Sequence, residues 1–303
     1  MHGGNAIIGA SDRMLTSGDI QFEPQQPKII QLTTSIFIMV AGDSSMQAEI
    51  IQNVRFEVNK RIATEPDNWW DVRDVANLYS HYYNDARFKR AEKNILSLLG
   101  LDNNTFIAKQ KEMDSGLVRQ LATELINYEA PRISAIFAGI DNSGAHIYVA
   151  DNENVSCQDL VGFAAIGVGS WHANSQMMFA GHTKFKLLPE TLLLVYSAKK
   201  RAEVAPGVGE ATDMVMVGPA LGSFSPIGNH VLDKLKEIHK SEQKREIKAS
   251  TKAKESVNQY VEELAKDATA KNQATIPPPD GGGETPSDEK KPRNDHQEGK
   301  PEN

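Results

Sequence analysis

Three residues in the amino-terminal part of the sequence have the types and the spacing of a candidate site. Asp12 ends an apolar run, Lys28 follows it by sixteen positions, and Gly42 follows Lys28 by fourteen. Taken singly, each has a structural explanation: an aspartate caps a turn, a lysine after a proline is a solvated charge, and a glycine turns the chain between a strand and a helix. Because the three form one spaced series, we favour a joint role in a site.

The histidines and the lone cysteine do not suggest a metal site. The residues concerned are His172, His182, His230, His239 and Cys157. None has the spacing from another, or from an acidic residue, that metal ligands show, and scattered histidines are more often surface or core residues. We therefore predict no metal.

Two other clusters favour packing and solvation over ligand binding. Tyr79, Tyr82 and Tyr83 recur at helical spacing, which is typical of a packed helix face or of a subunit interface. Residues 240–254 are locally basic, but glutamates interrupt the run, so we interpret it as the solvated face of a helix.

The composition is that of an ordinary folded protein in water. Hydrophobic residues make up 40% and charged residues 24% of the chain, and the formal net charge of -7 disfavours a nucleic-acid partner. No apolar run approaches the roughly 20 residues that span a bilayer, and the first residues lack the basic and apolar parts of a signal peptide. Since the lone Cys157 cannot form an internal disulfide, a reducing compartment fits best, and we expect a cytoplasmic protein with no membrane partner.

Strands must position the first two candidate residues, and a strand followed by a helix must position the third. Residues 5–39 are rich in Ile, Phe, Thr and Val and are broken at 17–19 and 24–27, which predicts three short strands. Residues 35–40 form the clearest buried strand. Gly42 then turns the chain into a helix expected over residues 46–61.

The middle of the chain predicts helices and then a hairpin. Residues 71–99 have a broad apolar face at helical spacing, while residues 105–128 carry mixed signals. Strands are expected at residues 133–140 and 146–150, joined by a tight turn, with a short third strand near 155–159.

Glycines then lead into two more helices and a last strand. After the glycine-punctuated segment 162–170, helices are expected over residues 171–181 and 189–203, and a strand over 212–217. Strands thus cluster rather than alternate singly with helices. This order predicts an α+β fold of layered, sandwich type rather than a doubly wound sheet.

The carboxyl-terminal part differs in composition from what precedes it. Residues 229–267 are charged and helix-prone, which predicts a surface helix or a pair of helices. Residues 268–303 are poor in hydrophobic residues and rich in Pro, Gly and charges, so we expect a disordered tail. The predicted organisation is therefore a domain at 1–228, a charged helical region at 229–267 and a tail at 268–303.

The amino-terminal motif resembles that of a known family. Residues 8–18, Ile-Gly-Ala-Ser-Asp-Arg-Met-Leu-Thr-Ser-Gly, are similar to the signature of proteasome β-type subunits, which are N-terminal nucleophile hydrolases. The positions of Lys28 and Gly42 after Asp12 match the family's pattern without a gap.

Later segments extend this resemblance. Residues 162–170 look like the family's strand and glycine turn before its third helix, and residues 189–198 resemble the helix that follows. The likeness covers about residues 4–217 and is loosest between 67 and 131. It implies a four-layer αββα sandwich of two antiparallel sheets, assembled with copies of itself or related subunits into a ring that encloses a proteolytic chamber.

The resemblance also implies a chemistry. In the family a chain-terminal Thr supplies the hydroxyl nucleophile, and its own amine accepts the proton. The residue matching Asp12 orients that terminus, the lysine matching Lys28 lowers the pKa of the amine, and the amide matching Gly42 stabilises the oxyanion. This chemistry needs no cofactor, and its substrate is unfolded polypeptide.

The sequence departs from the family pattern at the nucleophile. In the family the Thr lies about sixteen residues before the aspartate that Asp12 matches. Only eleven residues precede Asp12, and none of residues 1–10 is Thr, Ser or Cys. We expect that an upstream start supplies the Thr and the first strand, without which residues 6–8 would form an unpaired apolar edge.

Two further positions lack a hydroxyl that the family carries. Val168 stands where the pattern has a Ser, and residues 203–207 keep the acid Glu203 and the glycine Gly207 of a related motif but lose its hydroxyl. These losses favour altered or absent activity.

Three hypotheses follow from the sequence. The first is a proteasome-like subunit of the threonine-type endopeptidase lineage that hydrolyses peptide bonds within a ring, given an upstream Thr segment. The second is a catalytically inactive subunit for structure or assembly. The third is a non-proteolytic amidase of the same fold, since a fold does not fix a substrate.

Overall fold

The computed structural model describes residues 5–274, including the side chains of residues 5–267. The chain divides into two units, the first ending at Glu242 and the second beginning at Gln243. The first unit is a mixed α/β structure in which every strand pair among the described residues is antiparallel. This agrees with the predicted α+β class.

The larger sheet of the first unit has five strands in the order β4-β5-β6-β7-β8. The strands are β4 (Ile29–Gln31), β5 (Ile36–Gly42), β6 (Ile133–Asp141), β7 (Gly144–Asp151) and β8 (Asn154–Cys157). β6 lies in the middle and is buried along nearly all of its length. The predicted hairpin joins β6 to β7, where Asp141 pairs with Gly144 across the turn.

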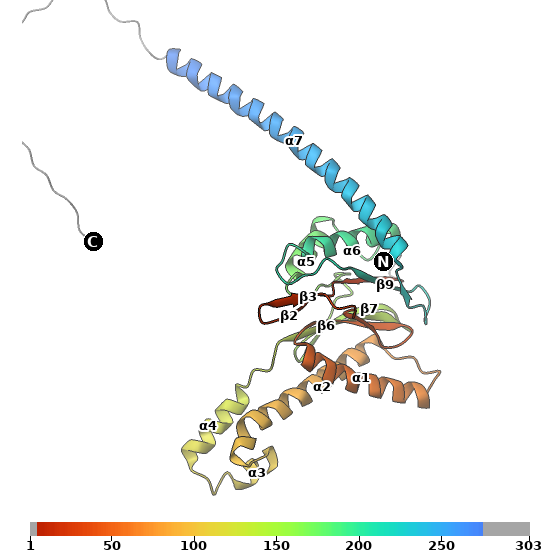
Figure 1. The fold of residues 1–303 in the computed structure, drawn as a ribbon, viewed down its shortest axis with the longest axis vertical. Helices are drawn as coiled ribbons and strands as arrows, with labels where there is room; N and C mark the ends of the chain where they lie inside the picture. The colour runs from red at the N-terminus through yellow and green to blue at the C-terminus, as the bar shows by residue number, and fades with distance from the viewer. Residues whose placement is uncertain (1–4, 275–303) are drawn as a thin grey trace, which may run out of the picture. The chain divides into compact units, whose positions relative to one another are not determined.

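Two long helices cover one face of this sheet. They are α1 (Ser44–Thr64) and α2 (Val72–Ala91), which lie together on the outer side of the sheet in Figure 1. Their inward stripes bury residues such as Val54 and Tyr79 against Phe137 of β6, in the largest apolar core of the chain. Asp43 begins α1 by accepting a hydrogen bond from the Met46 amide at 2.7 Å, which satisfies one of the helix's free amides.

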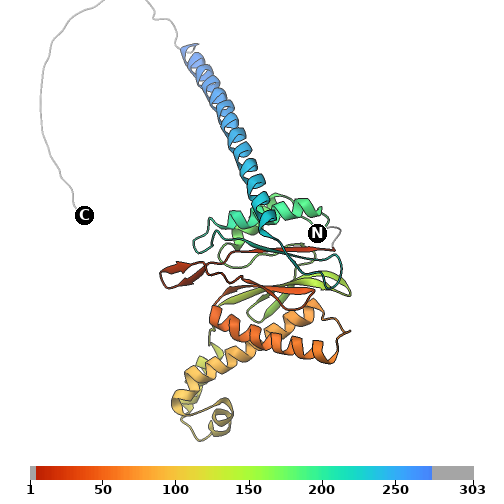
Figure 2. The same cartoon turned by 45° about the vertical axis from the view of Figure 1, so that its right-hand side comes forward.

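The opposite face of the five-stranded sheet packs against a second sheet. This smaller sheet has the order β1-β9-β10, with strands β1 (Ile7–Ser11), β9 (Asp213–Val217) and β10 (Ser225–Pro226). Ile7 and Val215 from the smaller sheet meet Phe37 and Ile136 from the larger one in a separate core. Figure 2 shows the two sheets stacked in this way.

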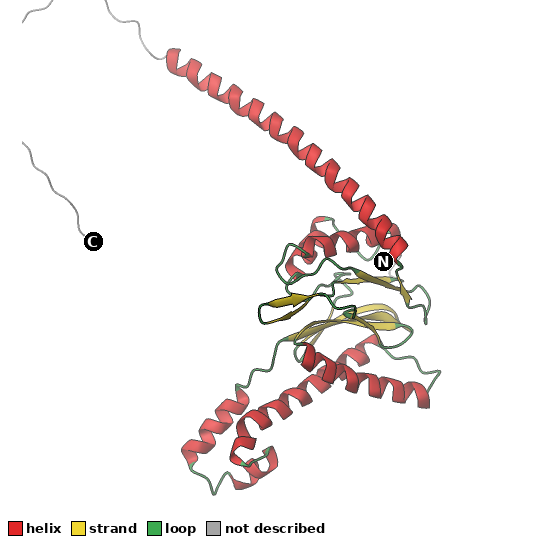
Figure 3. Cartoon of the chain, in the orientation of Figure 1, coloured by secondary structure: helices red, strands yellow, loops and turns green. Residues whose placement is uncertain are grey.

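A second helix pair lies over the smaller sheet. It consists of α5 (Ser170–Phe179) and α6 (Leu188–Ala202), which contact each other, and α6 also contacts β1. Tyr196 of α6 packs with Met214 of β9 and with Leu235, near the start of α7 (Asn229–Ala274). Figure 3 shows helices, in red, on both outer sides of the yellow sheets.

The remaining elements are smaller. β2 (Leu15–Ser17) and β3 (Ile20–Phe22) form a hairpin beside the end of β1. After α2, the chain continues through a π-helical segment (Glu92–Leu96) and a 3-10 turn (Ser97–Leu99) into α3 (Asn103–Lys109) and α4 (Ser115–Ile126). These last elements share a small core of their own around Leu96, Phe106 and Leu121.

The structure corrects three expectations about the elements. Five strands, not three, lie between residues 5 and 42, because strands of three residues are too short to show a period of two. The helix expected over 71–99 ends as an α-helix at Ala91. α7 continues to Ala274, so residues 268–274 are helical, and the rest of the expected tail lies outside the described residues.

The carboxyl-terminal helix is one continuous element rather than a pair. The sequence predicts a boundary after residue 228. The division between the two units falls within α7, and Val231, Leu232 and Leu235, which belong to the first unit, pack in one cluster with Tyr196 and Met214. In the second unit, Val257, Tyr260, Val261 and Leu264 form an exposed apolar stripe. Among the helices of the described residues, none combines the length and the apolar character needed to cross a bilayer.

Candidate functional site

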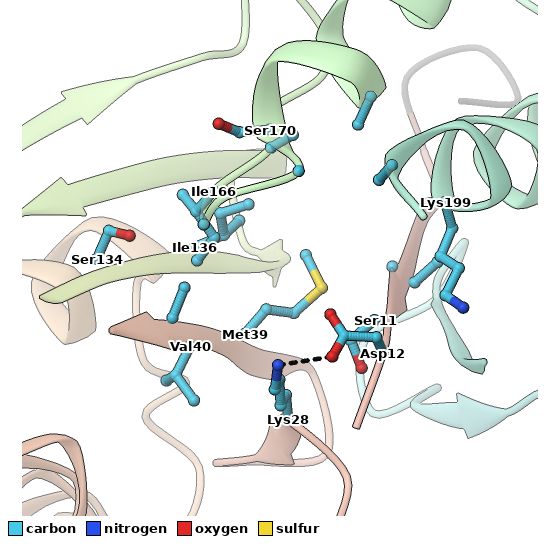
Figure 4. A pocket seen from close by; sticks show the side chains of 18 of the residues that line it. Ser11, Asp12, Lys28, Met39, Val40, Ser134, Ile136, Ile166, Ser170 and Lys199 are labelled. Carbon is cyan, nitrogen blue, oxygen red and sulfur yellow. Dashed lines mark hydrogen bonds and ion pairs between the residues drawn. The ribbon is translucent and has the colours of Figure 1, made fainter. Parts of the chain in front are cut away.

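Asp12 and Lys28 form an ion pair at the ends of two strands. Asp12 directly follows β1 and Lys28 directly precedes β4, and the Lys28 Nζ lies 2.7 Å from the Asp12 Oδ1 (Figure 4). The same Oδ1 accepts a hydrogen bond from the Met14 amide at 2.6 Å. Both side chains are largely shielded, with 23% of Lys28 and 17% of Asp12 exposed. The carboxylate is therefore fixed by two donors, and the ammonium is fixed by the carboxylate.

Gly42 occupies a position that only glycine fits. It ends β5 with a φ of 102°, a region that side-chain-bearing residues rarely adopt, and a Cβ there would lie 2.3 Å from the carbonyl oxygen of Arg132. The glycine allows β5 to stay paired with β6 up to Ile133 and then to enter α1 at once.

The three predicted residues line the same cavity, which has a volume of about 1360 Å³. It lies between the two sheets and the start of α5, and apolar side chains such as Met39, Ile136 and Ile166 form much of its wall. The structure thus brings together an acid, an amine and a glycine that are distant in the sequence. Among the described residues, no hydroxyl or thiol side chain forms a hydrogen bond with Lys28.

Lys199 is a buried charge in the same cavity wall that we did not predict. Its Nζ donates to the Glu203 Oε1 at 2.5 Å and to the carbonyl oxygens of Gly209 and Glu210 at 2.9 and 3.0 Å. Burial lowers the pKa of Lys199, and the hydrogen bond that its ammonium donates to Glu203 opposes that effect. The lysine therefore ties the end of α6 to the loop at residues 203–210.

A sequence signal for Lys199 did exist. The residues of α6 that line the cavity are Thr191, Val195, Ala198, Lys199 and Ala202. These positions repeat at three- and four-residue intervals, so they share one inward helix face. A charged residue on an inward helix face is rarely buried without a partner. The helical register of Lys199 therefore predicts a buried ion pair or hydrogen bonds.

Val168, where the family pattern has a hydroxyl, lines the same cavity. Gly207, the glycine that the second motif keeps, lines it as well. Gly169 lets α5 start close to α6, because a Cβ there would lie 2.8 Å from the Cβ of Ala202. Glu203 is engaged by Lys199 and also by Lys200, whose Nζ lies 2.7 Å from the Glu203 Oε1. The acid is therefore already neutralised within the structure.

A second polar cluster, also not predicted, lies at the β6–β7 turn. His146 Nδ1 lies 2.7 Å from the Asp159 Oδ2, and its Nε2 lies 2.8 Å from the Ser143 Oγ. The Ser143 hydroxyl also lies 2.6 Å from Asp141, whose other oxygen accepts a hydrogen bond from the Val72 amide at the start of α2. Ser143 is exposed on a turn outside the cavity. We interpret this cluster as a structural tie between the turn and α2.

The two carboxylates of this cluster have lowered pKa values. Burial alone would raise the pKa of Asp141, but hydrogen bonds from Ser143 and from the Val72 amide outweigh it. Burial would likewise raise the pKa of Asp159, but the hydrogen bonds from His146 and from the Ile147 amide lower it. Both groups are thus held in their charged form.

No metal site and no relative adds to this description. The described residues contain no group of three or more His, Cys, Asp or Glu side chains that could hold a metal ion. Comparison with protein-family models and with curated proteins gives no match to this chain.

Proposed function

We propose that this chain is a proteasome-like subunit of the threonine-type endopeptidase lineage, with the four-layer αββα sandwich of the N-terminal nucleophile hydrolases. The observation that carries the proposal is the ion pair of Asp12 and Lys28 in the cavity that Gly42 also lines. The same three positions are those that the family resemblance implies.

The packing of the first unit supports the finer fold. One apolar core lies between α1, α2 and the five-stranded sheet, a second lies between the two sheets, and a third lies between the smaller sheet and α6. Three successive cores of this kind separate four layers.

The proposed chemistry assigns a role to each residue. A Thr at the head of a strand beside β1 attacks the peptide carbonyl, and its own amine accepts the hydroxyl proton. The Lys28 ammonium lowers the pKa of that amine through like-charge proximity, and Asp12 holds the ammonium in place. The Gly42 amide donates to the oxyanion. Among the described residues β1 pairs with β9 alone, which leaves its other edge available for that strand.

The proposal places the protein in the cytoplasm, in a ring of copies of itself or of related subunits, with unfolded polypeptide as the substrate. Its experiment starts from the codons read in frame upstream of Met1. If they encode a strand led by Thr, the extended protein is expected to hydrolyse fluorogenic peptides. Lys28→Ala should lower kcat/KM by about 10²-fold or more, because the group that tunes the base is lost.

Lys200→Ala provides a matched control, since it removes an ammonium from the helix outside the Asp12 pair. It should leave kcat/KM within about threefold of the parent. Equal losses in both variants, or an inactive extended protein, would contradict the proposal.

A second candidate is a catalytically inactive subunit for ring structure or assembly. It is favoured by Val168, an apolar residue in the cavity wall, and by the engagement of Glu203 with two lysines. A stop codon directly upstream of Met1, together with ring-sized assemblies in solution, would support this candidate over the first.

A further inference from the structure

Gln47 is a buried polar side chain at the start of α1. It is 3% exposed, and the other residues that α1 buries are apolar. Burying an amide without hydrogen-bond partners costs free energy, so the polar atoms of Gln47 need partners within the protein. Those partners show what this side chain holds in place.

The side-chain amide of Gln47 bonds two strands and a second helix. Its Nε2 donates to the carbonyl oxygens of Ala41, on β5, and Ser134, on β6, at 3.0 and 3.1 Å. Its Oε1 accepts a hydrogen bond from the Tyr79 hydroxyl of α2 at 2.7 Å. Because only the NH₂ end of an amide can donate to two carbonyl oxygens, the orientation of the side chain is determined.

Tyr79 holds the oxygen end of this amide from within the core. Its ring is fully buried and packs edge-on against Phe137 of β6, with the ring centroids 5.3 Å apart. Burial raises the pKa of Tyr79, so its hydroxyl keeps the proton that it donates. Gln47 is thus fixed at both ends of its amide.

The Ala41 carbonyl that Gln47 binds belongs to the peptide group that contains the Gly42 amide. In a trans peptide the C=O and the N–H point in opposite directions, so holding one fixes the other. A glycine in this position resists turning of the peptide only weakly, since it adopts both signs of φ readily. The bond from Gln47 therefore holds the Gly42 amide at the point where the pairing of β5 with β6 ends.

The pairing of β5 shows which way the Gly42 amide points. The Asp43 amide bonds the Arg132 carbonyl, beside β6, at 3.3 Å. The Val40 amide bonds the Lys28 carbonyl, on the opposite side of β5, at 3.3 Å. Since neighbouring residues of a strand direct their amides to alternate sides, the Gly42 amide points to the same side as that of Val40. This is the side on which Lys28 precedes β4, and both Gly42 and Lys28 line the cavity.

From these contacts we infer that Gln47, held by Tyr79, is a positioning residue that orients the Gly42 amide toward the oxyanion of the reaction. It touches no reacting atom and acts through the peptide between Ala41 and Gly42. A donor on the carbonyl of a peptide also polarises its N–H, which strengthens the hydrogen bond that the N–H donates. The inference rests on the proposed function, because the oxyanion forms only when the upstream Thr attacks a substrate.

The first test measures steady-state kinetics of the upstream-extended protein with fluorogenic peptides. Gln47→Met keeps the size of the side chain and removes both donors. It should lower kcat by about 10- to 100-fold and leave KM within about twofold, because the oxyanion exists in the transition state and not in the bound substrate. Tyr79→Phe should lower kcat by only about three- to fivefold, since Gln47 keeps its bonds to both carbonyl groups.

Val54→Ala is the matched control for a loss of packing. Val54 lies on α1, two turns beyond Gln47, and is fully buried in the largest core. The variant does not touch the peptide between Ala41 and Gly42, so it should lower the unfolding temperature and keep the parent's kcat. Circular dichroism melting gives the unfolding temperature of each variant.

The second test compares two inhibitors that share one peptide sequence. In a peptide aldehyde, the Thr oxygen adds to the aldehyde carbon and the hydroxyl proton passes to the Thr amine, which leaves the aldehyde oxygen in the place of the oxyanion. The matching peptide alcohol binds without forming a bond. Gln47→Met should raise the Ki of the aldehyde by about the factor by which it lowers kcat/KM, and it should leave the Ki of the alcohol within about twofold.

The outcomes separate this inference from the proposed function. If the extended parent is inactive, the proposed function fails and the inference fails with it. If the parent is active but Gln47→Met lowers kcat no more than Val54→Ala does, the inference is overturned and the proposed function stands. A rise in KM alone, or equal weakening of the aldehyde and the alcohol, would overturn it as well. Should Gln47→Met not fold, the same criteria apply to Tyr79→Phe.

Discussion

The two helix pairs that cover the sheets differ in what they do with apolar side chains. α1 and α2 direct theirs inward, into the largest core, and leave only single exposed residues such as Phe56 and Phe88. α5 and α6 contribute to smaller cores and to the cavity wall, and α5 exposes an apolar face as well. Most apolar side chains of the first pair are therefore buried in the core. The second pair lines the cavity on one side, and α5 leaves apolar side chains exposed on the other.

This difference teaches where stability and function lie in the molecule. A helix pair whose inner face meets only a close-packed core can bury its apolar side chains there. A helix pair that borders a cavity has side chains on its inner face that no other side chain covers. Lys199 illustrates this difference between the two pairs. A buried ammonium would lack hydrogen-bond partners in an apolar core, but in the cavity wall it donates to the backbone of the loop at residues 203–210. Substitutions on the two sides should therefore have different consequences.

The largest difference is expected at the centres of the two cores. Tyr79 of α2 is fully buried, bonds Gln47 through its hydroxyl at 2.7 Å and packs on Phe137. Tyr79→Ala should lower the free energy of unfolding by about 4 kcal/mol, while Met177→Ala in α5 should cost about 2 kcal/mol. Urea unfolding measures both, and a larger loss for Met177→Ala would break the comparison.

A smaller effect is expected at the glycine that joins the larger sheet to α1. Gly42→Ala should lower the free energy of unfolding by about 3 kcal/mol, since a left-handed residue costs roughly 1–2 kcal/mol and the Arg132 carbonyl adds a clash. Gly18→Ala is the control, because Gly18 also has a positive φ but has open space around it. It should cost only about 1 kcal/mol. Equal costs in thermal or urea unfolding would show that the close approach at Gly42 is unimportant.

Replacing the buried Lys199 of α6 should loosen one loop more than it lowers the stability of the whole fold. Lys199→Met removes the ammonium from two carbonyl groups and from Glu203, and should cost about 2 kcal/mol. Hydrogen exchange of the amides at residues 204–210 should become faster, because the loop loses its tie to α6. Lys200→Met, at the more exposed neighbour, should cost less than about 1 kcal/mol and leave that exchange unchanged.

The smallest effect concerns acid pH on the α1–α2 side. The folded pKa of Asp159 lies below its ordinary value of 3.8, so its carboxylate contributes stability above that value and loses it as the pH falls through the folded pKa. Asp159→Asn should cost about 1 kcal/mol at neutral pH, and the difference from the parent should vanish once the pH falls below the folded pKa. The exposed Asp85→Asn is the control and should cost less than Asp159→Asn at neutral pH. A loss that persists in acid would point to packing instead of charge.

Much of the fold was predictable because its signals are local. The buried run before Gly42, the helical spacing of α1 and the turn between β6 and β7 each lie within one short window of sequence. The strands of three residues were not, because pairing across the chain rather than their own pattern defines them. The length of α7 was underestimated, since the low hydrophobicity that predicts disorder begins before the helix ends.

The candidate site was predictable only through the spacing of Asp12, Lys28 and Gly42. No rule of local sequence places the first two at the adjoining ends of β1 and β4, and the resemblance supplied that expectation. The network at His146 was missed because its partners Asp141 and Asp159 come from either side of a hairpin and form no motif in sequence. Lys199 could have been predicted from its helical register, because it lies on the same face of α6 as the apolar residues that line the cavity.

The most direct measurement is intact-mass spectrometry of the upstream-extended protein after treatment with a peptide epoxyketone, followed by peptide mapping. The account predicts one adduct, located on the amino-terminal Thr, that is absent from the 303-residue chain and from the extended Lys28→Ala variant. An adduct on the 303-residue chain, or labelling that persists without Lys28, would contradict the claim that Asp12, Lys28 and Gly42 surround the place of the nucleophile.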